Sequence, residues 1–354
     1  MDNLERIRLK LPEYGLDAIM INSPINRLFA TGFHSSDGVL IVSENDAWFY
    51  TDFRYIESAL NSIRGAHVSV ATKDATYALQ IEALLNEIGV VSIGFEDSTV
   101  TYAGYLDWTQ KLTAQLSPAQ KLLDELRAVK TESELAFLKK AQLVAEKTFL
   151  EILPLISTDM TEKQLAAEIT YRAISNGADD KSFDPIVVSG TRTSMPHGEP
   201  GDVRITEGFL TIDYGVRLNG WCSDTTRTLC VGTPDDEMIN IYNIVLRAQE
   251  AGIAAARAGV SGCDVDSAAR SIIEKAGYGK NFGHGFGHGI GLEVHENPTA
   301  SPTNTRPLPA GAVISAEPGI YIPDRYGVRI EDVIHIKEGG CENITNLPKD
   351  LIIL

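Results

Sequence analysis

Two aspartates, Asp213 and Asp224, lie on either side of a turn signal and are spaced so that they can bind a metal ion together. Asn219 and Gly220, which lie between them, are the dipeptide most typical of a two-residue β-hairpin turn. A hairpin closed at this turn places Gly215 opposite Asp224, so the two aspartates become diagonal neighbours on one face. Carboxylates this close repel each other unless cations lie between them. The alternative is a pair of solvated strand aspartates, although strands are poor in aspartate.

Glu317 and Glu331 form a second carboxylate pair, on either side of another expected loop. If Pro323 to Gly327 is a five-residue loop, Tyr321 faces Arg329, and these two side chains share one face with both glutamates. A loop that differs by one residue would move half of this set to the other face. The proline directly after Glu317 is expected to limit the strand pairing there.

Three of the seven histidines lie between Gly283 and His295, in the segment GHGFGHGIGLEVH. His284 and His288 have the spacing of a helical metal-binding pair, but the alternating glycines argue against a helix. We expect an extended or looped backbone here, because glycine lets a bound group approach closely. His197 lies apart, in the loop sequence MPHG. The clustering of the three histidines favours a functional site over isolated surface roles.

The charges of these candidates match a site for two metal ions. Four carboxylates and one neutral imidazole carry four negative charges, which two divalent cations neutralise, and water can then be activated near neutral pH. Oxygen-rich ligands with a single histidine favour Mn²⁺, with Co²⁺ and Zn²⁺ as alternatives. We therefore predict a centre of two divalent metal ions.

The elements that position these residues are expected in two domains. Residues 1–125 alternate helical and strand patterns without a dinucleotide-binding glycine motif, which predicts a smaller α/β domain. A capping box from Thr131 to Glu134 begins a long helix, so the boundary is placed near Leu126 and residues 126–354 form the second domain. In this second domain the order helix, helix, strands occurs twice. The pattern predicts an α+β fold with an internal duplication.

The overall composition excludes several classes of protein. A formal net charge of −17 argues against nucleic acid as a partner, because phosphates are bound by lysine and arginine. The charged start of the chain does not resemble a signal peptide, and no apolar run is long enough to span a membrane. The cysteines are few, scattered and without a CxxC pair: Cys222, Cys230, Cys263 and Cys341. This usage is typical of a reducing compartment, so we expect a cytoplasmic protein.

The candidate ligands appear in the order Asp, Asp, His, Glu, Glu, and the chain resembles the metallopeptidases that include aminopeptidase P, prolidase and methionine aminopeptidase. The matching motifs are IDYG (Asp213), SDTTR (Asp224), GHGIG (His288), AEPG (Glu317) and RIED (Glu331). The first domain is similar to the creatinase-type domain of aminopeptidase P and prolidase, with the marks TGF at 31–33 and TDFRY at 51–55. Methionine aminopeptidases lack this domain and fit poorly. The resemblance implies a C-terminal pita-bread fold with a pseudo-twofold duplication.

The resemblance also implies how the ligands are shared. Asp213 and Asp224 would hold one metal ion, and His288 and Glu317 would hold the other. Asp224 and Glu331 would bridge the two ions. Glu317 would in addition carry a proton from the activated water to the leaving nitrogen.

The remaining candidates are expected to act on the substrate or on the ligands. By the same resemblance, His295 and His197 would polarise the scissile carbonyl or stabilise the tetrahedral intermediate. His284 would shape the substrate pocket. Arg329 and Tyr321 would hold the metal ligands in place.

The expected reaction is hydrolysis of the bond between an N-terminal residue and a following proline, as in Xaa-Pro aminopeptidases. The substrates would be short peptides with proline at the second position, and the family implies a homodimer. An Xaa-Pro dipeptidase (prolidase) is the alternative, and it needs a cation for the carboxylate of its substrate. Prolidases often carry arginine where this chain has Gly285, which favours the aminopeptidase, whereas Arg192 and Arg325 are candidate cations for a dipeptidase.

Two other activities on the same fold are more remote alternatives. One is a catalytically inactive binding protein that has lost its metal ions, and the other is metal-free hydrolysis of the creatinase type. Both are expected to lack part of the ligand set. The five candidate ligands are all present here, which argues against either alternative.

Overall fold

The computed structural model describes residues 1–354 and divides them into two compact units, residues 1–127 and residues 128–354. Each unit has its own sheets and helices, and each is described by itself. None of the helices combines the length and the apolar character that crossing a membrane requires.

The first unit is an α/β domain built on one six-stranded sheet with the order β4-β3-β2-β1-β5-β6. Strands β1 to β3 pair antiparallel, whereas β4, β5 and β6 join parallel to their neighbours. Its elements are α1 (Asn3–Lys10), β1 (Ala18–Ile21), α2 (Pro24–Thr31), β2 (Val39–Ser43), β3 (Ala47–Thr51), α3 (Ile56–Ser62), β4 (His67–Val70), α4 (Tyr77–Ile88), β5 (Ser92–Phe95), α5 (Tyr102–Lys111), β6 (Gln115–Pro118) and α6 (Gln120–Ala128).

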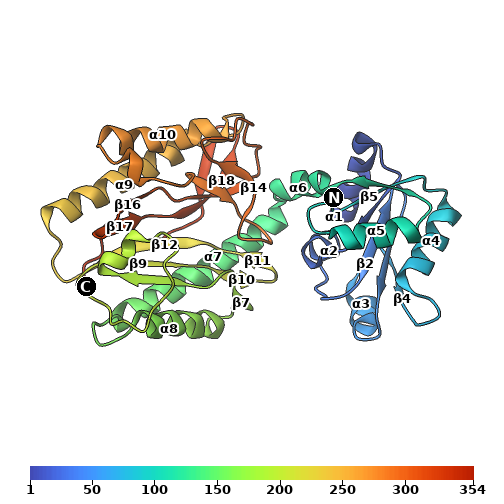
Figure 1. The fold of residues 1–354 in the computed structure, drawn as a ribbon, viewed down its shortest axis with the longest axis horizontal. Coiled ribbons are helices and arrows are strands. Elements are labelled where there is room, and N and C mark those ends of the chain that lie inside the picture. The colour runs from blue at the N-terminus through green and yellow to red at the C-terminus, as the bar shows by residue number, and fades with distance from the viewer. The chain divides into compact units, whose positions relative to one another are not determined.

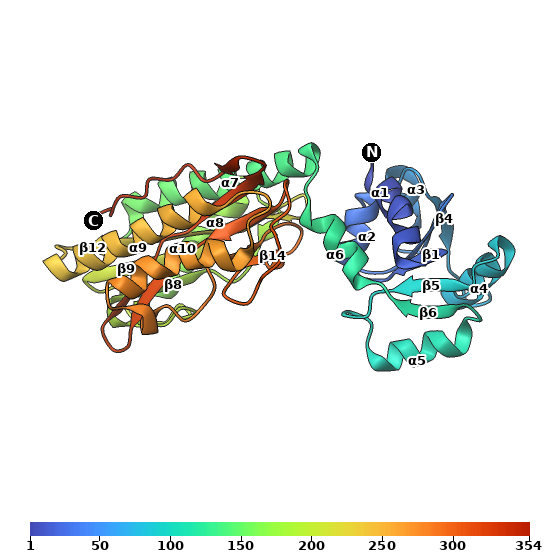
Figure 2. The ribbon, with the colours of Figure 1, turned by 90° about the horizontal axis from the view of Figure 1, so that it is seen from above.

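Both faces of this sheet are covered by helices. Figure 2 shows α1 and α2 on one side of the strands and α5 on the other. Ala18 and Met20, which alternate along β1, belong to the core cluster that includes Ile81 and Leu85 of α4. All four residues of β1 are buried, as expected for a strand with helices on both faces.

The second unit carries two pairs of helices and a larger set of strands. The first half contains α7 (Glu132–Ile152), α8 (Glu162–Ser175), β7 (Asp180–Lys181), β8 (Ile186–Ser189), β9 (Gly208–Tyr214), β10 (Val216–Leu218), β11 (Trp221–Cys222) and β12 (Thr225–Val231). The second half contains α9 (Asp236–Ala255), α10 (Gly262–Lys275), β13 (Gly287–Gly289), β14 (Glu296–Ala300), β15 (Val313–Ala316), β16 (Gly319–Ile322), β17 (Tyr326–Arg329), β18 (Asp332–Lys337) and β19 (Gly340–Asn343).

The order helix, helix, strands therefore occurs twice, as the sequence predicts. Figure 1 shows α9 and α10 on one side of the strands of this unit and α7 and α8 on the other. The strands form a sheet β12-β9-β8 in the first half and a sheet β14-β13-β15-β18-β19 in the second. Capping boxes at Thr131 and Thr161 begin α7 and α8, and side-chain caps from Asp235 and Ser261 begin α9 and α10.

The hairpin that carries the aspartates has the register predicted from its turn. Leu218 pairs with Trp221 in the β10–β11 hairpin. The same register continues in the β9–β12 pair, where Asp213 lies opposite Thr226. Asn219 adopts a positive φ of 51°, which this tight turn requires. The chain after the turn is interrupted between β11 and β12, just before Thr225, and Asp224 lies in this interruption.

The loop predicted between the two glutamates has the wrong length. Ile322 pairs with Tyr326 rather than Val328, so the loop contains three residues instead of five. Asp324 takes a left-handed conformation with φ 61°, which closes the shorter turn. The register is displaced by two residues, and an even displacement keeps each side chain on its face. Tyr321 and Arg329 consequently still share a face, as the sequence predicts.

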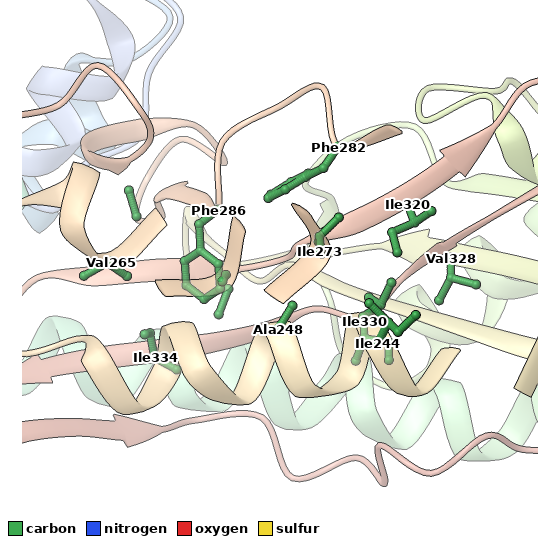
Figure 3. Packing of buried hydrophobic residues seen from close by; sticks show 14 of the residues in the cluster. Ile244, Ala248, Val265, Ile273, Phe282, Phe286, Ile320, Val328, Ile330 and Ile334 are labelled. Atoms are coloured by element: carbon green, nitrogen blue, oxygen red, sulfur yellow. The ribbon is translucent and has the colours of Figure 1, made fainter. Parts of the chain in front are cut away.

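Glycine allows α9 to pack closely against the histidine-rich segment. A side chain added at Gly252 would place its Cβ 2.2 Å from the ring of Phe286. Phe286 is fully buried in the core of the second half, together with Ala248, Ile334 and other apolar residues, and Figure 3 shows these side chains between α9 and the strands. Because Phe286 precedes His288 by two residues, this contact fixes the path of a candidate metal ligand.

Gly252→Ala is expected to destabilise the protein in spite of alanine's better helix propensity. The propensity favours alanine by about 1 kcal/mol, whereas overpacking a core costs about 1–3 kcal/mol, and the rigid, buried ring places this site toward the upper end, for a net loss of up to about 2 kcal/mol. The melting temperature should fall relative to wild type. Gly339→Ala is the control, because its Cβ would meet nothing within 4 Å. An unchanged or raised melting temperature for Gly252→Ala would contradict the predicted steric conflict.

Candidate metal centre

A cavity of about 530 Å³ in the second unit brings most of the predicted site residues together. Its volume lies within the range of small-molecule sites. The residues that line it include nine of the predicted ones: His197, Asp213, Asp224, His284, His288, His295, Glu317, Arg329 and Glu331. The tenth, Tyr321, lies behind the lining and contacts Arg329 and His284.

The two aspartates come from neighbouring positions of the β9–β12 hairpin, and both are buried. Arg329 Nη2 donates to Asp213 Oδ2 at 2.5 Å, and Asp213 Oδ1 is buried without a hydrogen-bond partner. Asp224 Oδ2 lies 3.7 Å from His288 Nε2. Each aspartate therefore directs a carboxylate toward the same space.

His288 and Glu317 approach that space from β13 and from the end of β15. His288 Nε2 lies 3.1 Å from Glu317 Oε1. The other ring nitrogen, Nδ1, lies 3.2 Å from the carbonyl oxygen of Gly289, which can only accept a hydrogen bond. We therefore assign a proton to Nδ1. Burial lowers the pKa of His288, but the hydrogen bond and charge of Glu317 outweigh it and raise that pKa, so in the metal-free protein Nε2 donates to Glu317. A cation bound here would take the place of the Nε2 proton.

Glu331 follows β17 and is held by the aspartate-bearing hairpin. Thr226 Oγ1 donates to Glu331 Oε2 at 2.7 Å, and the main-chain N–H of Glu331 donates to the carbonyl of Thr226 at 3.1 Å. Glu331 Oε1 is buried and has no hydrogen-bond partner. One carboxylate oxygen of Glu331 is thus fixed by the protein, and the other remains available to a ligand.

The electrostatics of the site follow from burial and from like charges. Burial raises the pKa values of Asp224 and Glu331 well above the usual carboxyl range, and neighbouring carboxylates raise them further. Burial likewise raises the pKa of Asp213. For Glu317 burial acts in the same direction, but the hydrogen bond and charge of His288 outweigh it and lower the pKa to about 2. The protein alone therefore does not stabilise four ionised carboxylates here.

The geometry of these groups fits divalent cations. Ligand atoms of Asp224, His288 and Glu331 all lie within 4.8 Å of one another. Two further carboxylates, Asp213 and Glu317, border the same cavity, and two buried carboxylate oxygens lack a partner. Buried polar atoms rarely remain unpaired in folded proteins, so these oxygens point to bound ions.

A chain of hydrogen bonds connects Asp213 with His284. Arg329 Nη1 donates to Tyr321 Oη at 2.8 Å, and Tyr321 Oη lies 3.0 Å from His284 Nε2. His284 Nδ1 lies 2.8 Å from the carbonyl oxygen of Gly285 and therefore carries its proton. Tyr321 then donates to His284 Nε2. Burial lowers the pKa of His284, which is consistent with the neutral ring that this pattern requires.

His295 and His197 border the cavity without belonging to the cluster of close ligand atoms. The ring of His295 lies 4.2 Å from that of His288, between centroids. Burial lowers the pKa of His295, and the charge of His288 lowers it further. A neutral His295 retains one N–H group that can donate to a substrate.

The loop that carries His197 is anchored by a buried carboxylate. Glu162 at the start of α8 accepts hydrogen bonds from the main-chain N–H of Gly201 and from Arg192 Nε, each at 3.0 Å. Arg192 Nη2 also donates to the carbonyl of Glu199 at 2.6 Å. This network fixes both ends of the loop, so Arg192 serves the loop rather than lining the cavity.

Two polar residues of the site were not singled out from the sequence. Thr226 donates to Glu331 and accepts from Arg329 Nε at 3.1 Å. Ser315 Oγ donates to Glu317 Oε1 at 2.9 Å and accepts from the main-chain N–H of His288 at 2.9 Å. Their positions carried a usable signal, since Thr226 belongs to the SDTTR motif and Ser315 precedes Glu317 by two residues, the repeat of a strand face.

Comparison with known families matches both units. Residues 136–338 match the model of metallopeptidase family M24, and residues 3–129 match the creatinase/prolidase N-terminal domain. The chain belongs to the M24 metallopeptidase family. This M24 protein is thus a metallopeptidase with a pita-bread domain preceded by a creatinase-type domain, and the family depends on metal ions.

Relatives of this M24 peptidase carry names of two kinds. The structure of an Xaa-Pro dipeptidase from Bacillus anthracis is similar with 39% identity and a TM-score of 0.96, over 99% of each chain. The X-Pro aminopeptidase from Thermotoga maritima gives 35% identity and a TM-score of 0.91, over 96% of this chain and 98% of that one. An Xaa-Pro dipeptidase of Pyrococcus furiosus is 34% identical over 99% of each chain.

Metal binding by the M24 peptidase is expected to release protons and to weaken in acid. In the metal-free protein the raised pKa values of Asp224 and Glu331 keep these carboxyls protonated at pH values where ordinary carboxyls are ionised. Because a cation binds the ionised carboxylate, the affinity for the metal ion should fall as the pH falls through the raised pKa values. Calorimetric titration with Mn²⁺ from about pH 8 to about pH 5, in buffers of different ionisation enthalpy, measures both effects. Equal heats in all buffers and constant affinity would contradict the assignment.

Proposed function

We propose that this M24 protein is an Xaa-Pro aminopeptidase that hydrolyses the bond between an N-terminal residue and a following proline. The proposed substrates are short peptides with proline at the second position. The proposal includes two divalent metal ions held by Asp213, Asp224, His288, Glu317 and Glu331. It also includes a cytoplasmic location and a homodimeric state, which follow from the composition and from the family resemblance.

The donor set supports Mn²⁺ as the metal, with Co²⁺ and Zn²⁺ as alternatives. Four carboxylates and one imidazole form an oxygen-rich set, which suits manganese better than a sulfur-rich or histidine-rich set would. Two divalent cations bound here would lower the pKa of water to near neutrality and polarise a carbonyl oxygen. The intact ligand set argues against a catalytically inactive binding protein on the same fold.

The proposed roles of the other side chains follow from their positions in the cavity. Glu317 borders the cavity beside the proposed ligands and would accept a proton from water and deliver it to the leaving nitrogen. His295 and His197 would donate hydrogen bonds to the carbonyl oxygen as negative charge develops on it. Arg329 holds Asp213, and Tyr321 holds His284, so these two residues orient groups that act directly.

The preference for an aminopeptidase rests on the pairing of the candidate arginines, each of which already binds a carboxylate of the protein. Arg329 is the only arginine or lysine among the lining residues, and it is already paired with Asp213. Arg192 is paired with Glu162. The second candidate cation, Arg325, forms two hydrogen bonds with the carboxylate of Glu237, at 2.9 and 2.7 Å. A dipeptidase needs a cation for the free carboxylate of its substrate, whereas an aminopeptidase does not.

An Xaa-Pro dipeptidase is the second candidate, and the names of relatives favour it. Proteins called Xaa-Pro dipeptidase match this chain at 39% and 34% identity over nearly its whole length. Histidines border the cavity at three positions outside the proposed ligand set, His197, His284 and His295. The N–H group of a neutral histidine can donate a hydrogen bond to a carboxylate, and this would let a dipeptidase bind the substrate carboxylate without arginine.

The two candidates are separated by comparing kcat/KM for Ala-Pro and for Ala-Pro-Ala with added Mn²⁺. We expect the tripeptide to be preferred by about tenfold or more, because a buried site that must leave a free carboxylate unpaired discriminates against it. Arg192→Ala should leave the ratio unchanged, since Arg192 holds the loop and not the substrate. A strong preference for Ala-Pro would favour the dipeptidase, and loss of that preference in Arg192→Ala would assign the cation to Arg192.

Two substitutions should separate metal ligation from stabilisation of the transition state. Glu331→Gln removes a bridging charge while keeping the shape, so metal content and activity should fall together. His295→Ala should retain its metal but lose about 10²–10³ in kcat, the typical effect of one lost oxyanion donor. Elemental analysis of each purified variant, together with its kinetics, checks both outcomes. Full metal content and activity in Glu331→Gln would disprove the proposed centre.

A further inference from the structure

A buried arginine, Arg227, lies directly behind the proposed bridging ligand Glu331. Its side chain is only 1% exposed, and β12 carries it next to Thr226, which binds the Glu331 carboxylate. A guanidinium has five N–H donors, and each of these finds an acceptor. The acceptors are the carbonyls of Thr226 (2.9 Å), Glu331 (2.5 Å), Leu347 (3.0 Å) and Pro348 (2.9 Å) and Asp332 Oδ1 (2.8 Å).

Asp332, the residue after Glu331, is the anionic partner of this arginine. Its carboxylate is fully buried and accepts from Arg227 on Oδ1. On Oδ2 it accepts from Asn343 at 2.7 Å and lies 2.6 Å from Lys349 Nζ. Two cations thus neutralise Asp332, and together they lower its pKa against the effect of burial. The backbone on both sides of the Glu331–Asp332 peptide is therefore fixed by charged contacts.

Lys349 extends the same network to the strand that leads to Glu317. Lys349 Nζ donates to Gln249 Oε1 at 2.9 Å, and Gln249 is fully buried. Gln249 Nε2 approaches the carbonyl oxygen of Ala316 at 3.4 Å. Ala316 directly precedes Glu317, so one lysine near the C-terminus contacts the supports of two proposed ligands.

Residues 346–354, which we call the C-terminal strap, are attached along β12 and α9. The carbonyl of Lys349 accepts from Tyr242 Oη at 2.8 Å. Further along, the main chain of Cys230 donates to Ile352 and accepts from Leu354, both at 2.9 Å. The strap thus follows β12, the strand that carries Thr226 and Arg227, and ends beside it.

We infer that Arg227 and the C-terminal strap position Glu331 for metal binding, so that the end of the chain sets the affinity of the metal centre. The argument is geometric. Thr226 fixes one oxygen of Glu331, Arg227 fixes its carbonyl group, and the strap supplies the carbonyls and the lysine that hold Arg227 and Asp332 in place. This inference rests on the proposed metal centre and assigns positioning residues to it. Residues that orient metal ligands typically change metal affinity by about 10- to 100-fold when they are replaced.

Arg227→Lys tests the role of the arginine with its charge retained. Lysine has three donors on a flexible stem instead of a rigid planar fork, so it cannot hold the five acceptors together. We expect the affinity for Mn²⁺, measured by calorimetric titration of the metal-free protein, to fall by about 10- to 100-fold. Arg27→Lys is the matched control, because Arg27 is 2% exposed and donates to the carbonyls of Gly38 and Ser35 in the first unit.

The control separates positioning from general loss of stability. Both arginine variants remove a buried guanidinium and should lower the melting temperature of the metal-free protein. Only Arg227→Lys should weaken Mn²⁺ binding, while Arg27→Lys should stay within about twofold of wild type. Equal Mn²⁺ affinity in Arg227→Lys and wild type, or an equal loss of affinity in both variants, would overturn the inference.

Lys349→Met tests the strap by itself and is available if Arg227→Lys fails to fold. Lys349 is partly exposed, so its loss should be tolerated, and Lys337→Met on β18 is the control for removing a lysine. We expect Mn²⁺ affinity to fall by about tenfold or more in Lys349→Met and to be unchanged in Lys337→Met. Wild-type affinity for Mn²⁺ in Lys349→Met would refute the positioning role of the C-terminal strap. A wild-type protein that binds no Mn²⁺, Co²⁺ or Zn²⁺ would instead refute the proposed metal centre.

Discussion

Repulsion between buried carboxylates is the constraint on which the second unit of this protein depends. Asp213, Asp224 and Glu331 have pKa values raised by burial, and isolated ionised carboxylates are costly inside a protein. The fold nevertheless directs them at one cavity together with Glu317. In the metal-free protein the raised pKa values keep Asp224 and Glu331 protonated, and the surrounding hydrogen bonds hold the carboxyl groups in position for cations that would neutralise their ionised forms.

Strand β12 contributes most of this frame. Thr226 binds Glu331 and Arg329, and the neighbouring Arg227 binds the backbone around Glu331. Thr228 accepts from the main-chain N–H of Arg329 and donates to its carbonyl group. Three consecutive residues of one strand therefore connect the aspartate hairpin of the first half to the glutamate strands of the second. These side-chain hydrogen bonds add to the main-chain hydrogen bond from Glu331 to Thr226 in joining the two halves.

The duplicated helices place a buried carboxylate behind each histidine loop. In the first half, Glu162 of α8 anchors the loop around His197. In the second half, Asp266 of α10 accepts from the main-chain N–H of Phe286 and pairs with Arg270, which donates to the carbonyl of His284. Both loops carry residues of the cavity, and both are held by carboxylate–arginine pairs rather than by apolar packing alone. Precise loops on a rigid scaffold are what an oriented catalytic site requires.

Part of this arrangement depends on interactions within a few residues, and the sequence by itself was sufficient to predict that part. The capping box at Thr131 and the turn at Asn219 act within a few residues, so the start of α7 and the aspartate hairpin were predicted correctly. The motif order of the candidate ligands also identified the family. The loop after Ile322 was predicted with the wrong length, because a proline followed by two polar residues is compatible with several turns.

Other features depend on segments that are far apart in the sequence, and only the tertiary structure decided them. Arg192 and Arg325 read as candidate cations for a substrate, but their partners Glu162 and Glu237 lie 30 and 88 residues away. The contacts of Arg227 with Leu347 and Pro348 span more than a hundred residues. A charged side chain has many partners of opposite sign in a sequence, and the partner it pairs with is set by the path of the folded backbone. The sequence thus predicted which residues would carry the chemistry, and the fold determined which of the charged side chains are already paired.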